Sequence, residues 1–301
     1  MGFKVKFAKN AAKNNGYVSA PIEERAEDIH EAFKDKNCSI IIASIGGNHS
    51  NQLVKMLDYK MIENNPKSFV GYSDNTVLHY AIATQSHLQT YYGPCFLTQF
   101  CEYPKVIDYT KNSFCQTVIS QDKEIKILQS EFYTDEILDW FKDEDSKRAR
   151  KLQNSKPAKY WKKGKASGWA FPITIPSINH LIGTKYLPDV NGSIMFLDIP
   201  EGNSINEGLS IADFDSFLTD IDNSNLLSKI HGLIIGKPYR YSNGMIDELR
   251  SVILRVCKKY DFPILFGVNI GHTDPMITIP IGSNINMGFS NTEVLSITRT
   301  K

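Results

Sequence analysis

The sequence has no run of apolar residues long enough to span a bilayer, and its first ten residues lack the apolar centre of a signal peptide. It also has little charge imbalance, because 34 basic and 33 acidic side chains nearly cancel and are scattered along the chain. Binding to a nucleic-acid backbone requires a concentrated basic surface, which this distribution does not provide. We therefore expect neither a membrane nor a nucleic-acid polymer as a partner.

Cysteines are few and follow no recognisable pattern. Their number is odd and none shows the CxxC spacing; they are Cys38, Cys95, Cys101, Cys115 and Cys257. This argues against a disulfide framework and against a structural zinc site. A reducing, cytoplasmic location fits best, and we expect no metal.

The chain is long enough for two domains with buried cores, at 301 residues and 42% hydrophobic content. Up to residue 120, short apolar runs alternate with helical segments, which is typical of a parallel sheet flanked by helices. The predicted strands of this part are residues 3–7, 39–44, 68–72 and 90–92, and the predicted helices are 21–34, 51–57 and 75–85. The predicted fold class is α/β.

Residues 121–164 are rich in charge and have few periodic apolar positions. They predict a linker or a surface excursion, with one helix near residues 135–142. Residues 165–301 return to the α/β pattern and predict a second, carboxyl-terminal domain. Its predicted strands are 193–197, 231–235 and 264–268, with closing strands at 276–280 and 293–299, and its predicted helices are 211–220 and 245–260.

A serine stands where an apolar strand meets a helix, in SFVGYSDNTVLHYAI. Such a turn can expose Ser73 at the edge of a sheet, while amides at the helix start, that of Asp74 first, point toward a developing oxyanion. The plain alternative is that Ser73 and Asp74 only cap the helix, as these residue types often do.

Paired glycines follow the preceding strand, in IIASIGGNHSNQL. Gly46 and Gly47 let the backbone approach a ligand closely, and in a parallel sheet this loop lies at the same edge as Ser73. Gly47 is therefore a candidate second oxyanion donor. The alternative is a tight strand-to-helix turn that binds nothing.

The candidate base and acid lie in the second half of the chain. His272 follows a glycine in a polar loop, in GVNIGHTDP, where a general base would be accessible. Asp198 ends the apolar run in IMFLDIPEG and could orient His272, with Glu201 as the competing carboxylate. An acid at a strand end can also serve only as a turn former.

Taken together, these segments resemble the LD-carboxypeptidase family, and within it the branch of microcin C immunity-type serine peptidases. The matching features run in order through nearly the whole chain: NGYVSAPIEERAEDIHEAF, IIASIGGNHSNQL, GYSDNT, YYGPCF, IMFLD, GLIIGKP and GHTDPMITIPIG. The resemblance implies a flavodoxin-like amino-terminal domain, a distinct α/β carboxyl-terminal domain, a Ser-Glu-His triad between them, and a homodimer.

Carried over by position, the resemblance implies Ser73 as nucleophile, His272 as base, and the amides of Gly47 and Asp74 as oxyanion donors. The family's glutamate falls on Asp198, which shortens the acid by one methylene group.

Further departures concern the start of the chain and the substrate contacts. Members usually begin with a strand and helix ahead of the segment resembling GFKVKF, where this chain begins, and GWAFPITIPSIN replaces a Gly-Gly-Asn-Leu-like stretch. In the immunity-type branch an aromatic residue in the middle excursion helps hold a nucleobase. Trp140 and Trp161 are the candidates here, and either could instead anchor the excursion to the domain surface.

The sequence thus predicts a serine peptidase or amidase that hydrolyses an amide bond near the carboxyl end of a small peptide or a peptidyl- or aminoacyl-nucleotide. No cofactor is expected. Gly46 and Glu201 join the two tryptophans as expected substrate contacts. The alternative is a non-catalytic relative that keeps the fold and binds a small ligand without turning it over.

Overall fold

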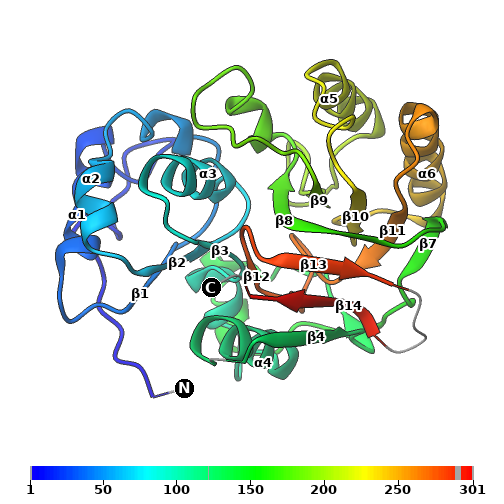
Figure 1. Cartoon of the computed structure of the whole chain (residues 1–301). Helices are drawn as coiled ribbons and strands as arrows, with labels where there is room; N and C mark the ends of the chain where they lie inside the picture. The colour runs from blue at the N-terminus through cyan, green and yellow to red at the C-terminus, as the bar shows by residue number, and fades with distance from the viewer. Residues whose placement is uncertain (1, 121, 289–292, 300–301) are drawn as a thin grey trace.

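The computed structural model describes residues 2–120, 122–288 and 293–299, which form two large sheets and a small two-stranded one (Figure 1). In this described part, the first sheet has the spatial order β1 (Ile40–Ile42), β2 (Ser68–Gly71), β3 (Tyr91–Tyr92) and β12 (Ile279–Pro280). Strands β1, β2 and β3 are parallel, while β12 is antiparallel to β3. The α/β prediction is confirmed.

The second sheet is larger and mixed. Its spatial order is β4 (Glu124–Leu128), β14 (Glu293–Thr298), β13 (Asn284–Met287), β8 (Ala166–Thr174), β9 (Ser193–Asp198), β10 (Gly232–Gly236), β11 (Ile264–Val268) and β7 (Lys159–Lys162). The four strands from β8 to β11 are parallel and buried, and antiparallel strands extend the sheet on both sides. A small hairpin pairs β5 (Phe132–Tyr133) with β6 (Gln153–Asn154).

The first three helices of the chain lie beside the first sheet, the fourth lies below the second sheet, and the last two lie above the second sheet (Figure 1). They are α1 (Ile22–Lys34), α2 (Tyr59–Asn64), α3 (Asn75–Ser86), α4 (Asp108–Phe114), α5 (Ile211–Asn223) and α6 (Asn243–Val256). Shorter 3-10 or π-helical segments are Ser50–Gln52, Phe96–Phe100, Cys115–Ile119, Trp140–Lys142, Glu144–Ser146, Ser177–His180 and Cys257–Lys259. Within this part of the chain, no helix is long and apolar enough to cross a membrane.

Helix α3 joins the two sheets, because it is buried along nearly its whole length. A helix buried on several sides carries no polar face, which fits the apolar sequence TVLHYAI. The hydroxyl of Tyr80 donates a 2.7 Å hydrogen bond to the carbonyl of Pro172 on β8. One turn earlier, Thr76 accepts from the amide of Thr174 at 3.3 Å. The start of α3, immediately after Ser73, is therefore held against the second sheet.

Two predicted elements of the first part are wrong. Residues 3–7 alternate apolar and charged side chains like a strand, but they form no strand pairing with any described residue. Phe3, Val5 and Phe7 are exposed, and the segment is held by side chains, with Lys6 paired to Asp35 at 2.7 Å and the ring of Phe7 edge-on to Phe96. The helix predicted at 51–57 is a short 3-10 segment followed by turns. A helix starts later, where the Asp58 side chain accepts from the amide of Met61 at 2.9 Å and caps α2.

The middle segment, predicted as a linker or excursion, contributes both outer strands of the second sheet, β4 and β7. The helix predicted near 135–142 is absent, and a 3-10 turn at Trp140–Lys142 takes its place. Strands β8 and β13 were also not predicted. The predicted strand at 276–280 shortens to β12 and joins the first sheet instead of closing the second. Where the chain divides into domains stays a prediction.

Candidate active site

Ser73 lies on the sharp turn between β2 and α3, with a φ of 63° that non-glycine residues rarely adopt. Strained turns of this kind hold a nucleophile at the edge of a sheet. Gly46 lies directly against it: a Cβ added to Gly46 would come within 2.7 Å of Ser73 Oγ. A side chain at that position would therefore displace the serine.

The predicted oxyanion donors lie beside this serine. The Asp74 carboxylate accepts from the amides of His49 and Ser50, both at 2.8 Å, and so fixes the loop that carries Gly46 and Gly47. Gly47 has a φ of 145°, which a side chain would strain. The position of a Cβ on Gly46 is 3.7 Å from the amide nitrogen of Asp74. The side chain of Asp74 thus orders the glycine loop, while the backbone nitrogen of Asp74 lies next to Ser73.

His272 connects the two halves of the chain. Its Nε2 lies 3.0 Å from Ser73 Oγ, and its Nδ1 lies 3.0 Å and 2.9 Å from the two carboxylate oxygens of Asp198. The imidazole is nearly buried and rests edge-on against the ring of Tyr72, with centroids 4.9 Å apart. The structure therefore brings Ser73, His272 and Asp198 together in the order that a serine hydrolase requires.

Asp198 ends β9 and is 1% exposed, yet its carboxylate is well supplied with donors. Tyr92 Oη donates to Oδ2 at 2.6 Å and Thr174 Oγ1 donates to it at 2.9 Å, while the amide of His272 donates to Oδ1 at 3.2 Å. Such bonds offset the cost of burying a charge. Neither Tyr92 nor Thr174 was predicted as a site residue.

The charges of the pair stabilise each other. Burial alone would lower the pKa of His272, but the negative charge of Asp198 and its hydrogen bond outweigh burial and raise that pKa above its ordinary value. Burial likewise acts to raise the pKa of Asp198, and the charge and hydrogen bond of His272 lower it overall. The pair therefore favours an imidazolium next to a carboxylate.

Glu201 occupies a different position from Asp198. Its Oε2 lies 3.6 Å from His272 Nε2, the nitrogen that faces Ser73, and its side chain is 40% exposed. A triad acid must hold the opposite nitrogen, Nδ1, as Asp198 does. The geometry favours Asp198 over Glu201 as the acid.

Gly271 explains how a short aspartate reaches the histidine. A Cβ on Gly271 would lie 1.8 Å from Asp198 Oδ1, and the residue has a φ of 86°. Only glycine lets the histidine loop lie directly on the carboxylate. The backbone approaches the acid closely enough for the short side chain of Asp198 to reach His272 Nδ1.

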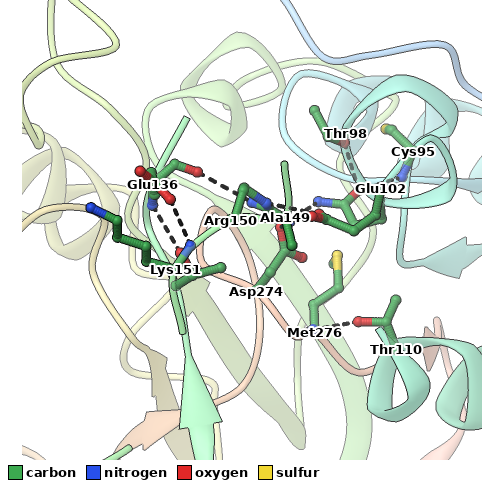
Figure 2. A network of polar contacts seen from close by, with 12 residues as sticks. Cys95, Thr98, Glu102, Thr110, Glu136, Ala149, Arg150, Lys151, Asp274 and Met276 are labelled. Carbon is green, nitrogen blue, oxygen red and sulfur yellow. Dashed lines mark hydrogen bonds and ion pairs between the residues drawn. The ribbon is translucent and has the colours of Figure 1, made fainter. Parts of the chain in front are cut away.

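A buried ion-pair network supports the loop after His272 (Figure 2). Arg150 pairs with Glu102 and also donates a 2.7 Å bond to Asp274 Oδ2. The backbones of Thr134 and Asp274 exchange hydrogen bonds of 2.6 Å and 2.9 Å. Residues 131–155, which we call the arm, are thus fixed at their base to the histidine loop.

The two candidate tryptophans lie in different surroundings. Trp140 is on the tip of the arm, 42% exposed, next to Phe141, which is fully exposed. Trp161 instead alternates inward on β7 and stacks on Phe266 with ring centroids 4.2 Å apart. It is a core residue, which leaves Trp140 as the accessible candidate. Among the described residues, no group of His, Cys, Asp or Glu side chains could hold a metal ion.

Both halves of the chain match known proteins of one family. Residues 1–93 match the family model of the LD-carboxypeptidase N-terminal domain, and residues 171–287 match that of its C-terminal domain. YocD of Bacillus subtilis is named as a carboxypeptidase. It is 32% identical over 94% of this chain and 82% of its own length. The chain belongs to the LD-carboxypeptidase family.

Other similar proteins belong to the immunity-type branch of this family. The microcin C7 self-immunity protein MccF of Escherichia coli is 29% identical over 97% of this chain and 83% of its own length. A structure of apo MccF superposes with a TM-score of 0.89 at 28% identity, covering 99% of this chain and 87% of that one. MccF has also been solved with aspartyl sulfamoyl adenosine and with glutamyl sulfamoyl guanosine.

Proposed function

We propose that the chain is a serine hydrolase of this family, with Ser73 as nucleophile, His272 as base and Asp198 as the acid that orients it. The observation that carries the proposal is the position of the imidazole, 3.0 Å from Ser73 Oγ on one side and 2.9 Å from an Asp198 oxygen on the other. This relay can take a proton from the serine and hold the resulting positive charge.

The reaction proceeds by acyl transfer. His272 Nε2 removes the proton of Ser73 Oγ as the oxygen attacks the scissile carbonyl carbon, and Nδ1–H donates to Asp198. When the C–N bond breaks, the imidazolium returns that proton to the leaving nitrogen. Water, deprotonated by the same histidine, then cleaves the ester and restores the serine. The mechanism uses side chains, backbone and water only.

The amides of Gly47 and Asp74 serve as oxyanion donors in this proposal. Both lie on backbone held next to Ser73, one through the Asp74 carboxylate and one at the start of α3. Preorganised amides stabilise the negative charge of the tetrahedral intermediate without further reorganisation. Gly46 keeps the intervening space free of a side chain.

The substrate is a small molecule with an amide or acyl-nitrogen bond near its carboxyl end. MccF, which is similar over nearly the whole chain, binds aminoacyl sulfamoyl nucleosides, and this supports an aminoacyl- or peptidyl-nucleotide. The exposed Trp140 on the arm is available to stack on a nucleobase. By the same family likeness we propose a cytoplasmic homodimer.

The test is turnover of aspartyl sulfamoyl adenosine and of a cell-wall tetrapeptide by the wild type and by Ser73→Ala. We expect hydrolysis by the wild type and a loss of about 10⁴-fold or more in the variant. Equal, negligible rates for both proteins would favour the alternative of a non-catalytic binding protein. Sedimentation of the purified protein tests the dimer.

A further inference from the structure

Glu201 lies beside the relay of Ser73, His272 and Asp198, and, against the effect of burial, its negative charge adds to that of Asp198 in raising the pKa of His272. Its Oε2 is 3.6 Å from His272 Nε2, and that nitrogen is 3.0 Å from Ser73 Oγ. The backbone of Glu201 forms an antiparallel β-bridge with Gly208, so the carboxylate projects from an ordered loop. A side chain that is 40% exposed at this place faces the space that a substrate must occupy.

The carboxylate lacks a strong cationic partner. Among the described residues, its ion pair is with His272, and no Lys or Arg nitrogen lies within 4.0 Å of it. The guanidinium of Arg240, on a neighbouring loop, is taken by Tyr239 Oη at 2.9 Å and by the carbonyl of Asn206 at 3.4 Å. When His272 is neutral, as a general base must be, this carboxylate therefore has no cation within 4.0 Å among the described residues.

Without a positive charge on the substrate, the negative charge of Glu201 would destabilise the oxyanion of the proposed reaction. The tetrahedral intermediate is an oxyanion, and a nearby carboxylate repels it. The repulsion disappears if the substrate itself brings a positive charge to this position. Among groups close to a carbonyl undergoing attack, the α-ammonium of an aminoacyl residue is two bonds away from the carbonyl carbon.

We propose that Glu201 binds the free α-ammonium group of an aminoacyl substrate on the acyl side of the bond that is cleaved. This inference rests on the proposed function and narrows its substrate class. An aminoacyl-nucleotide carries that ammonium, whereas the acyl residue at a peptide's penultimate position has its α-nitrogen in an amide bond. Glu201 thus selects aminoacyl compounds over longer peptides.

The experiment compares aspartyl sulfamoyl adenosine with its N-acetyl derivative, in which an uncharged amide replaces the ammonium; a preference caused by the bulk of the acetyl group would persist in Glu201→Gln. Three proteins are assayed: the wild type, Glu201→Gln, and the control Glu207→Gln, an exposed acid on the same loop. We expect the wild type and the control to prefer the free amine by about 10-fold or more in kcat/KM, and Glu201→Gln to lose that preference through KM. A hydrogen bond between opposite charges has this strength.

Binding of the two compounds is also measured by calorimetry in a Ser73→Ala background, with and without Glu201→Gln. This readout does not depend on turnover, so a failure of the proposed hydrolase function leaves the inference testable. Equal affinity of Ser73→Ala for both compounds would overturn it. So would a loss of activity in Glu201→Gln that is the same for both compounds, since that result assigns Glu201 to the histidine alone.

Discussion

Arg150 Nη2 lies 2.7 Å from Asp274 Oδ2, so the arm holds the loop that carries His272 through a buried ion pair (Figure 2). The guanidinium also pairs with Glu102, and the side chains of Arg150, Glu102 and Asp274 are 14%, 8% and 6% exposed. The guanidinium of Arg150 therefore links the arm to two other segments: the one that follows Phe96–Phe100, through Glu102, and the histidine loop, through Asp274.

Replacing Arg150 by Met should destabilise the protein by about 3 kcal/mol, because it leaves two buried carboxylates without their cation. Urea unfolding measures this loss. The matched control is Arg148→Met, which breaks the more exposed pair with Glu136, with side chains 44% and 25% exposed. That change should cost less than about 1 kcal/mol. Equal losses of unfolding free energy in the two variants would show that the buried Arg150 network stabilises the protein no more than the exposed Arg148 pair does.

Asp198→Asn should lower kcat by about 10⁴-fold, because the amide no longer fixes the imidazole in the tautomer that accepts the serine proton. Asp198→Glu, which introduces the glutamate that the family resemblance implies, should also lower kcat by at least about 10-fold. The added methylene group has no room, since Gly271 already lies against the carboxylate. Steady-state kinetics on the same substrate check both. Full activity in Asp198→Glu would contradict the close approach described for Gly271.

Tyr92→Phe removes a hydroxyl that donates to Asp198 and contacts Thr174. We expect kcat to fall by about 10-fold with little change in KM, together with a loss of about 1–3 kcal/mol in stability. Tyr80→Phe is the control, because Tyr80 is as deeply buried and loses one 2.7 Å bond to a β8 carbonyl. It should lose stability and keep its kcat, which separates a role in the site from a role in packing.

The pairing of His272 with Asp198 predicts a dependence of stability on pH. The folded-state pKa of His272 is raised above its usual 6.5, so the stabilisation is fully present below pH 6.5 and is lost as the pH rises through the folded value. The pKa of Asp198 is lowered, so its contribution is present above its usual 3.8 and is lost only at a lower pH. Between these limits, the free energy of unfolding of the wild type, relative to His272→Gln, should be highest. Urea unfolding of both proteins from pH 4 to pH 9 measures it, and a difference that grows above pH 6.5 would contradict the assignment.

Trp140→Ala should raise KM for a nucleoside-bearing substrate by about 10-fold and leave KM for a tetrapeptide unchanged, because stacking on a base contributes about 1–3 kcal/mol. Trp161→Phe should instead lower stability through its stack on Phe266 and leave both KM values unchanged. Parallel assays on the two substrates distinguish the outcomes. If Trp140→Ala affected the tetrapeptide as much, the arm would contact a part that both substrates share.

Much of the candidate site could be predicted because strand ends meet. Ser73 and the glycine pair follow β2 and β1, neighbouring parallel strands of the first sheet, so they meet at one edge. Asp198 ends β9 of the second sheet, and it was found from the same strand-end pattern, although the packing of the two sheets is what brings it to His272. His272 was found from its glycine and its polar loop. Tyr92 and Thr174 were missed, since hydroxyl-bearing and aromatic residues are ordinary in strands. Their signal was position: Thr174 is the register partner of Asp198 on the adjacent strand.

The middle of the chain was the hardest part to predict. The strand β4 alternates buried and exposed positions in EIKIL, but the surrounding charge hid that pattern. Arg150 was passed over for the same reason, because a charged residue in a charged segment usually faces solvent. Only the folded chain shows that it pairs with carboxylates on two distant segments. Pairing across 48 and 124 positions leaves no local trace in the sequence.

The loop that carries His272 leaves the second sheet at β11 and enters the first sheet at β12. A hinge that swung one sheet away from the other would have to break the hydrogen bonds that hold this loop, among them those from the Ile277 amide to Asn269 at 2.8 Å and from the Asp274 amide to Thr134 at 2.9 Å. Because the arm is also fixed to the histidine loop through Arg150, we expect the passage of substrate and product to depend on the exposed loop around Glu201. We expect the two sheets to move as one body during turnover, with any opening confined to that loop.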